Sequence, residues 1–241
     1  MAQSKIIGII SYFPDEPELR ENRRTRCFKL LNTLNEHFKL PIILVAQNWT
    51  DEELSKLNDF KNQKIYAFVY NKLGITGARI KLRKIFLDRT DADYIILLDD
   101  DSDLIIKEGG VEHYLKEIDD HPNMFCKWNM GFPRLMAISR YSYNKLSYDF
   151  IAGLEPERGE VWEDHCWHQV YKQLWPNEVY EFSRYNMQEV SLYSEHDPNS
   201  VYYKKWVNDS NEEKFRRNRE MWVRCAYIIE AWKKHILDGG K

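Results

Sequence analysis

Apolar runs and amphipathic stretches alternate along the first half of the chain. Apolar positions that recur every three or four residues predict helices over Thr25–Phe38 and Ala78–Thr90. The polar residues 12–24 and the two glycines Gly74 and Gly77 predict loops. Short runs rich in branched side chains predict buried strands at Lys5–Ser11, Pro41–Trp49, Lys64–Tyr70 and residues 92–98. Strands that alternate with helices in this way indicate βαβ units in a mostly parallel sheet.

The second half of the chain shows fewer strands and longer helical patterns. The predicted elements are a strand over Arg134–Arg140 and helices over Val111–Asp120, Glu163–Leu174 and Asn211–Leu237. The last helix carries an apolar stripe at helical spacing, so one of its faces should pack on the rest of the protein. We therefore expect an α/β fold, with helices flanking a mostly parallel, Rossmann-like sheet. The expected domain covers residues 1–205, and a C-terminal helical extension over 206–241 packs on it.

Composition and charge narrow the class of protein. Hydrophobic residues make up 43% of the 241 residues, which is enough for a sizeable core. The net charge of −3 gives no overall signal for nucleic acid. The four cysteines form no Cys-x-x-Cys pair, which argues against a zinc site and for buried thiols in a reducing compartment. Without a signal sequence or an apolar run of roughly 20 residues, the chain is expected to be cytoplasmic and to lack a membrane span.

An acidic cluster follows the strand predicted over residues 92–98. Asp99, Asp100, Asp101 and Asp103 stand where this strand reaches the edge of the sheet, and open α/β sheets bind ligands at that edge. Adjacent carboxylates repel one another unless a cation or hydrogen-bond donors neutralise them. Side chains alternate along a strand, so Asp99 and Asp101 should point to the same side, one toward a ribose and one toward a metal. A solvated acidic turn is the alternative.

The segment that contains this cluster resembles the donor site of GT-A glycosyltransferases. Residues 77–104 read GARIKLRKIFLDRTDADYIILLDDDSDL, which is a helix, a polar gap, an apolar strand and a DxD motif. The resemblance implies a GT-A fold and a nucleotide-sugar donor, with a UDP-sugar favoured. It assigns residues 1–105 to a nucleotide-sugar-binding half and residues 106–205 to an acceptor half.

The same resemblance implies roles for individual residues of the donor site. Asp99, Asp100 and Asp101 would bind the donor, and Asp101 would ligate Mn²⁺ or Mg²⁺ with Asp103 as a further ligand. These cations prefer carboxylate oxygens and substrate phosphates. Arg79 matches a basic residue that lies near the donor in family-2-like enzymes. For Arg79, a solvated charge on a helix face is the alternative.

A second acidic motif, Trp162-Glu163-Asp164, stands at the start of a predicted helix. Inverting GT-A enzymes place a Glu-Asp pair at such a helix start, where a carboxylate removes the proton of the acceptor hydroxyl. The resemblance therefore implies Asp164 as general base, Glu163 as its support in acceptor binding, and Trp162 as a surface that stacks on the acceptor. The preceding loop, ERGEVW, has fewer glycines than is common in the family, which leaves the acceptor open. The alternatives are a favourable charge on the helix dipole for the two acids and a core anchor for Trp162.

His196 lies in a polar loop late in the chain, within the sequence YSEHDPNSVYY. Several GT-A enzymes use a late histidine as a further metal ligand, and imidazole suits Mn²⁺ beside carboxylates. The resemblance therefore implies His196 as a metal ligand. A surface histidine in an Asp-Pro turn is the alternative.

Two clusters of basic residues leave the acceptor open between a glycan and DNA. The first comprises Arg20, Arg23, Arg24 and Arg26, and the second comprises Arg216, Arg217, Arg219, Lys233 and Lys234. Solvated helix faces are the simplest interpretation, because glutamates are interleaved with the arginines. A track for a phosphate-bearing acceptor, such as a hydroxymethylated DNA base, and a site for the donor diphosphate are the alternatives.

The predicted function is metal-dependent transfer of a sugar from a nucleotide-sugar to an acceptor hydroxyl with inversion. A nucleotidyltransferase also uses carboxylates and a metal on an α/β sheet, but its typical glycine-rich phosphate loop is missing after the first strand. A degenerate GT-A domain that only binds partners is the remaining alternative. Such a domain is expected to lose its acidic motifs, and both are present here.

Overall fold

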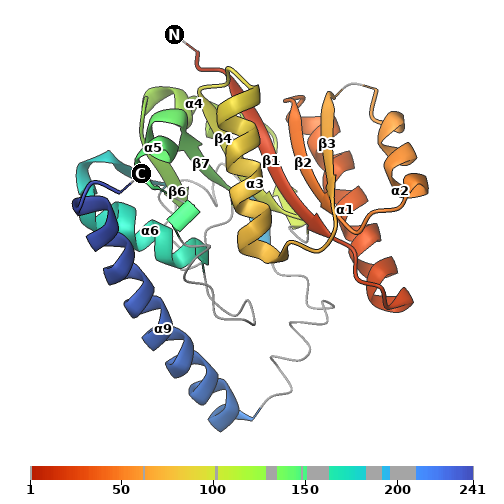
Figure 1. Ribbon diagram of the computed structural model, residues 1–241. Helices are drawn as coiled ribbons and strands as arrows, with labels where there is room; N and C mark the ends of the chain where they lie inside the picture. The colour runs from red at the N-terminus through yellow and green to blue at the C-terminus, as the bar shows by residue number, and fades with distance from the viewer. Residues whose placement is uncertain are drawn as a thin grey trace.

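The computed structural model describes residues 2–61, 63–100, 103–128, 135–147, 149–150, 163–182, 192–195 and 210–240. Its centre is a twisted sheet with helices on both faces, and a long C-terminal helix runs along one side (Figure 1). This is the α/β architecture that the alternation of apolar runs and helical patterns predicts. The predicted fold class is therefore confirmed.

Within the described residues, the main sheet has seven strands in the order β3-β2-β1-β4-β7-β6-β8. Neighbouring strands are parallel from β3 to β4 and between β6 and β8, whereas β7 is antiparallel to both of its neighbours. The seven strands are β1 (Lys5–Tyr12), β2 (Ile42–Gln47), β3 (Ile65–Tyr70), β4 (Tyr94–Asp99), β6 (Phe125–Trp128), β7 (Met136–Ser139) and β8 (Val179–Phe182). A separate antiparallel pair is formed by β5 (Asp103–Ile106) and β9 (Leu192–Glu195).

Helices cover the two faces of the sheet and divide the core into two clusters. One face packs against α1 (Pro17–His37) and α4 (Gly110–Asp120). The opposite face packs against α3 (Gly74–Arg89), α5 (Arg140–Lys145), α6 (Glu163–Leu174) and α9 (Asn211–Leu237). The short helices α2 (Asp51–Ser55) and η1 (Lys56–Asp59) join β2 to β3, and η3 (Pro176–Glu178) precedes β8. Because both faces are covered, β1, β2 and β4 are apolar on both sides, as the continuous apolar runs predict.

Two helices begin earlier than the sequence pattern predicts. Helix α1 begins at Pro17, so most of the loop expected over residues 12–24 is helical. Proline at the first helical position is a start signal, because its missing N–H is not needed there. Helix α3 begins at Gly74 and not at Ala78, and Gly74 has a φ of +72° that suits glycine. Both corrections extend a helix toward the edge of the sheet where the acidic cluster lies.

The C-terminal helix α9 packs against α6 on one face of the sheet (Figure 1). The ranges predicted for both helices, 163–174 and 211–237, are confirmed. Trp232 of α9 is fully buried, and its indole N–H donates to the carbonyl of Leu146 at 2.7 Å. In contrast, Trp222 on the same helix is about half exposed. The part of the apolar stripe from Cys225 to Trp232 is therefore in the protein core, whereas Trp222 is not.

Replacing Trp232 with phenylalanine is expected to lower the free energy of unfolding by about 2 kcal/mol. The change leaves the buried Leu146 carbonyl without its donor and leaves a small cavity. Urea unfolding followed by circular dichroism measures the loss. Trp222→Phe is the matched control and should stay within about 0.5 kcal/mol of the parent protein. Equal effects of the two changes would contradict the buried position of Trp232.

Two further expectations concern domains and the membrane. The predicted boundary between residues 205 and 206 lies outside the described residues, and the predicted division at residue 105 falls inside β5. In the part of the chain that is described, no helix combines the length and the apolar character needed to cross a bilayer.

Candidate functional site

The strand order reverses between β1 and β4, and this defines the candidate site. From β1 the chain continues to β2 and β3 on one side, and then returns through α3 to place β4 on the other side of β1. Open α/β sheets bind ligands at the carboxyl ends of the strands at such a switch point. The pairing register aligns Ile10 with Asp99, so the ends of both strands meet at one edge.

Asp99 lies at this edge and forms an ion pair with Arg79 of α3. The Arg79 side chain is buried, so the alternative of a solvated charge on the helix face is wrong. Asp99 keeps 41% of its side chain exposed, which leaves its carboxylate within reach of a ligand. The sequence analysis assigned both Asp99 and Arg79 to donor binding, although they lie 20 residues apart. The structure brings the two side chains into contact.

Asp100 points to the opposite face of the sheet and is buried. Its Oδ2 accepts hydrogen bonds from the Ser11 hydroxyl at 2.8 Å and from the backbone N–H of Tyr12 at 3.3 Å. Its Oδ1 accepts a charged hydrogen bond from Arg23 of α1 at 3.0 Å. These groups come from β1 and α1, so Asp100 joins the end of β4 to both. Its predicted contact with the donor stays a prediction.

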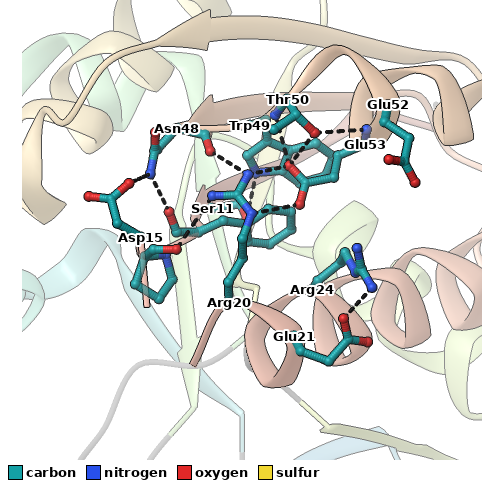
Figure 2. A network of polar contacts seen from close by, with 12 residues as sticks. Ser11, Asp15, Arg20, Glu21, Arg24, Asn48, Trp49, Thr50, Glu52 and Glu53 are labelled. Carbon is teal, nitrogen blue, oxygen red and sulfur yellow. Dashed lines mark hydrogen bonds and ion pairs between the residues drawn. The ribbon is translucent and has the colours of Figure 1, made fainter. Parts of the chain in front are cut away.

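A further ion pair, between Arg20 and Glu53, joins α1 to α2, the helices that follow β1 and β2 (Figure 2). The Arg20 Nε donates to Glu53 at 3.0 Å, and one terminal nitrogen also donates to the backbone carbonyl of Asn48 at 2.9 Å. Glu53 in turn caps α2 with Thr50, through a capping box in which each residue bonds the backbone of the other. Within the first basic cluster, Arg20, Arg23 and Arg24 all form ion pairs with acidic side chains.

Asn48 and Trp49 complete the network at the end of β2 (Figure 2). Asn48 has a left-handed backbone with φ of +59°, which asparagine tolerates well. Its amide donates to the carbonyl of Phe13 and to Asp15, both at 2.8 Å. The Trp49 ring stacks on Phe13 at 4.4 Å, and its indole N–H donates to Ser11 at 3.1 Å. Side chains from β1, α1 and α2 therefore hold the loops around the switch point together.

Tyr12, at the end of β1, is a candidate site residue that the sequence prediction missed. Alternation along β1 places it on the same face as Ile10, which is the α3 side where Asp99 meets Arg79. The ammonium of Lys72 lies 5.7 Å from the centre of its ring. An aromatic ring beside a cation suits a nucleobase and a phosphate. An aromatic residue that directly ends the first strand was the available signal.

Acid is expected to destabilise the protein in part through Glu53. Burial alone raises the pKa of Glu53, but the hydrogen bonds from Arg20 and Thr50 outweigh it and the pKa is lowered. A lowered pKa contributes stability above the pKa of the unfolded chain, about 4.3, and that stability is lost as pH falls through the folded value.

Glu53→Gln should therefore cost about 1–2 kcal/mol at neutral pH, and the cost should shrink below about pH 4. Glutamine can still complete the capping box through its amide oxygen, so the change removes the charge and one of the two hydrogen bonds from Arg20 but keeps the cap. Glu52→Gln, on the same helix but exposed, is the control and should change little. A cost for Glu53→Gln that is the same at pH 7 and pH 3 would contradict the role of the ion pair.

The predicted metal ligands are only partly within the described residues. Asp101 and His196 lie outside them, and Asp103 is described in its backbone alone. In β5 and β9, Asp103 pairs with Glu195, so the strand that leads into His196 runs beside Asp103. Among the side chains that are described, no three histidine, cysteine, aspartate or glutamate residues form a metal-binding group. The metal assignment stays a prediction.

The predicted acceptor residues are located only in part. Glu163 and Asp164 form the first turn of α6, as predicted, but their side chains are not among those described. Trp162 lies outside the described residues. The neighbouring histidine His168 is buried against Phe125 of β6, in keeping with a packing role.

Comparisons with known proteins support the fold. S. aureus TarS 1–349 is 15% identical with a TM-score of 0.51, and the match covers 92% of this chain and 71% of that one. A Desulfovibrio desulfuricans protein assigned as a nucleotide-diphospho-sugar transferase is 12% identical with a TM-score of 0.50, covering 93% and 97% of the two chains. A Bacillus anthracis protein assigned as a glucose-1-phosphate thymidylyltransferase is 13% identical with a TM-score of 0.53, covering 85% and 94%.

The chain has a GT-A-type fold. It spans only 43% of the longer S. aureus TarS chain. No protein-family model and no curated protein sequence matches it. At these sequence identities the likeness establishes the fold, and the chemistry must be argued from the site.

Proposed function

We propose that this protein is a glycosyltransferase that moves a sugar from a nucleotide-sugar to an acceptor hydroxyl. The observation that carries the proposal is the exposed Asp99 carboxylate, paired with buried Arg79, at the switch point of a GT-A-type sheet. Tyr12 and Lys72 stand on the same side and supply an aromatic surface and a positive charge. A nucleoside diphosphate needs these features: a surface for the base, an acceptor for ribose hydroxyls and a cation for phosphate.

Asp164 acts as general base in this proposal. It takes the proton of the acceptor hydroxyl while the hydroxyl oxygen attacks the anomeric carbon. The bond from that carbon to the diphosphate breaks on the opposite side, so the configuration inverts. Glu163 and Trp162 bind the acceptor next to the base. These roles rest on the resemblance of the Trp-Glu-Asp motif to inverting GT-A enzymes.

A divalent cation fits the chemistry of the donor edge. Carboxylate oxygens are the ligands that Mg²⁺ and Mn²⁺ prefer, and Asp99 remains accessible at that edge. Asp101 would hold the cation, with Asp103 and His196 as further ligands. A bound cation supplies positive charge against the departing diphosphate.

The ion pairs of the basic clusters favour a glycan over DNA as acceptor. Arg20 and Arg23 are bound to Glu53 and Asp100, and on α9 Arg216 pairs with Glu213 and Glu220. An arginine that is already paired with a carboxylate neutralises less of the charge on a DNA phosphate. It therefore displaces fewer counterions from the DNA and adds less to binding. A modified DNA base remains the second acceptor to test.

A nucleotidyltransferase is the competing enzyme class, because one of the structural neighbours carries that assignment. Such enzymes typically bind phosphates with a glycine-rich loop after the first strand. Here that loop, residues 13–16, contains no glycine, and its backbone carbonyls accept hydrogen bonds from Asn48 and Arg20. This arrangement favours glycosyl transfer.

Thermal unfolding with a panel of nucleotide-sugars, with and without Mn²⁺, tests the proposal. A ligand at 100 times its Kd stabilises the folded state by about 2.7 kcal/mol, which raises the Tm of a protein of this size by about 5–10 °C. We expect a shift with a UDP-sugar that depends on Mn²⁺. A donor that shifts the Tm is then offered to glycans and to hydroxymethylated DNA.

The competing classes give different outcomes. A nucleotidyltransferase would respond to a nucleoside triphosphate and release pyrophosphate when a sugar 1-phosphate is added. A folded protein with no shift for any nucleotide-sugar would overturn the proposal and favour a domain that only binds partners.

A further inference from the structure

Three consecutive aspartates stand at the end of β4, and the first two turn to opposite faces of the sheet. The residues before them set the alternation: Leu97 belongs to the core on the α3 side, and Leu98 to the core on the α1 side. Asp99 continues the first series and meets Arg79 on α3. Asp100 continues the second series and meets Arg23 on α1. Each carboxylate therefore has its own arginine, one on each side of the sheet.

The two aspartates differ sharply in exposure. Asp99 has 41% of its side chain exposed, whereas Asp100 has 6%. Both carboxylate oxygens of Asp100 accept hydrogen bonds from protein groups, which include Arg23, the Ser11 hydroxyl and the N–H of Tyr12. The Ser11 hydroxyl is itself oriented by the indole N–H of Trp49. Asp100 is thus built into the wall between β1, β4 and α1.

We propose that Arg23 is a positioning residue for the donor site and that it acts through Asp100. By holding Asp100 inward, Arg23 fixes the direction in which the chain leaves β4 and so presents Asp99 on the donor side. The role of Asp100 is then to orient the acidic motif and not to touch the donor. This inference rests on the proposed function for the identity of the ligand. The contact between Arg23 and Asp100 is independent of that function.

The physical reason is the cost of weakening the contacts of a buried charge. Without the Arg23 guanidinium, the buried Asp100 carboxylate would lose a charged partner and would rotate toward water more readily. Rotation would move it to the exposed edge, where it meets the negative charge of Asp99. This rotation would disturb the end of β4, because Asp100 directly follows Asp99, the last residue of that strand.

Arg23→Met tests the proposal, with Arg24→Met as its matched control. Arg24 is the next residue on α1. Among the described side chains, it forms its ion pair with Glu21 and not with the acidic motif. Hydrogen–deuterium exchange is measured on the fragment that covers the end of β4, residues 97–103, and on β2 as a reference. The affinity for UDP is measured by calorimetry, with and without Mn²⁺.

We expect Arg23→Met to speed exchange in residues 97–103 at least 10-fold, to leave β2 unchanged and to weaken UDP binding in Mn²⁺ at least 10-fold. Arg24→Met should change neither quantity. Unchanged exchange at the end of β4, or changed exchange with wild-type UDP affinity, would overturn the proposal. If the parent protein binds no nucleoside diphosphate, the proposed function fails, and the exchange result still decides whether Arg23 holds β4.

Asp100→Asn provides the second variant, because it keeps the size of the side chain and the hydrogen bond from Ser11. If Arg23 acts through Asp100, Arg23→Met should add little to the effect of Asp100→Asn on UDP affinity. Full additivity of the two changes would mean that Arg23 contacts the ligand directly, and the proposal would be wrong. If Arg23→Met alone folds poorly, Asp100→Asn still tests the role of Asp100, because parent-like exchange in residues 97–103 of that variant would overturn the proposal.

Discussion

Replacing Asp164 with asparagine is expected to slow sugar transfer about 10²- to 10⁴-fold while donor affinity stays the same. Asparagine has the shape of aspartate but cannot accept the proton of the acceptor hydroxyl, so the loss falls on the chemical step. The corresponding rise in the activation barrier is about 3–5 kcal/mol. Single-turnover transfer with saturating donor measures it, and calorimetry with UDP measures donor affinity.

Glu163→Gln is the control for this prediction, because it changes the adjacent acid in the same turn of α6. As a residue that supports acceptor binding, Glu163 should affect the KM for the acceptor more than kcat. If Asp164→Asn keeps transfer within a few-fold of the parent and Glu163→Gln abolishes it, the two roles must be exchanged. If neither variant loses transfer, the base lies elsewhere.

Asp101→Asn is expected to remove metal-dependent donor binding. Loss of a charged metal ligand should weaken UDP binding in Mn²⁺ by at least about 100-fold, or about 2.8 kcal/mol, and leave the weak metal-free binding unchanged. Calorimetric titration of UDP in Mn²⁺ and in EDTA measures both values. The expected result is a variant that binds UDP equally in the two buffers.

Asp91→Asn is the matched control for Asp101→Asn. Asp91 is exposed and precedes β4, at the end of the strand away from the candidate site, so its loss should change neither affinity. Metal-dependent affinity that survives Asp101→Asn would show that the cation is held by other ligands. Asp103 and His196 would then be the next residues to replace.

Local sequence pattern was sufficient for β1 to β4 and for the longer helices, but it did not predict β5, β6, β8 or β9. The ranges of α6 and α9 agree with the prediction because their apolar positions repeat with the period of a helix. The strands β1, β2 and β4 were found because strands covered on both faces are continuously apolar. The start of α1 was missed because the residues from Phe13 to Glu16 carry loop signals, and Pro17 was not weighed as a helix start.

The sequence predicted which types of residue form the candidate site, but not which side chains pair with each other there. Asp99 and Asp100 lie at the edge of the sheet as predicted, because a strand that ends in aspartates puts them there. The ion pair of Arg79 with Asp99 spans 20 residues, and that of Arg23 with Asp100 spans 77. No local period connects residues so far apart. The basic cluster on α1 therefore looked like a solvated surface, although Arg20 and Arg23 hold the loops and strands around the site.

The sequence by itself determined the alternation of strands and helices in the first half of the chain and the position of the acidic motif, because these follow from periodicity and from neighbours along the chain. Only the tertiary structure decided that Asp99 faces α3 and stays partly exposed, while Asp100 faces α1 and the interior. That choice depends on which helix covers each face of the sheet and on which arginine it carries. Partners of this kind are set by packing between distant segments, where burial makes a charge stable only beside its counter-charge.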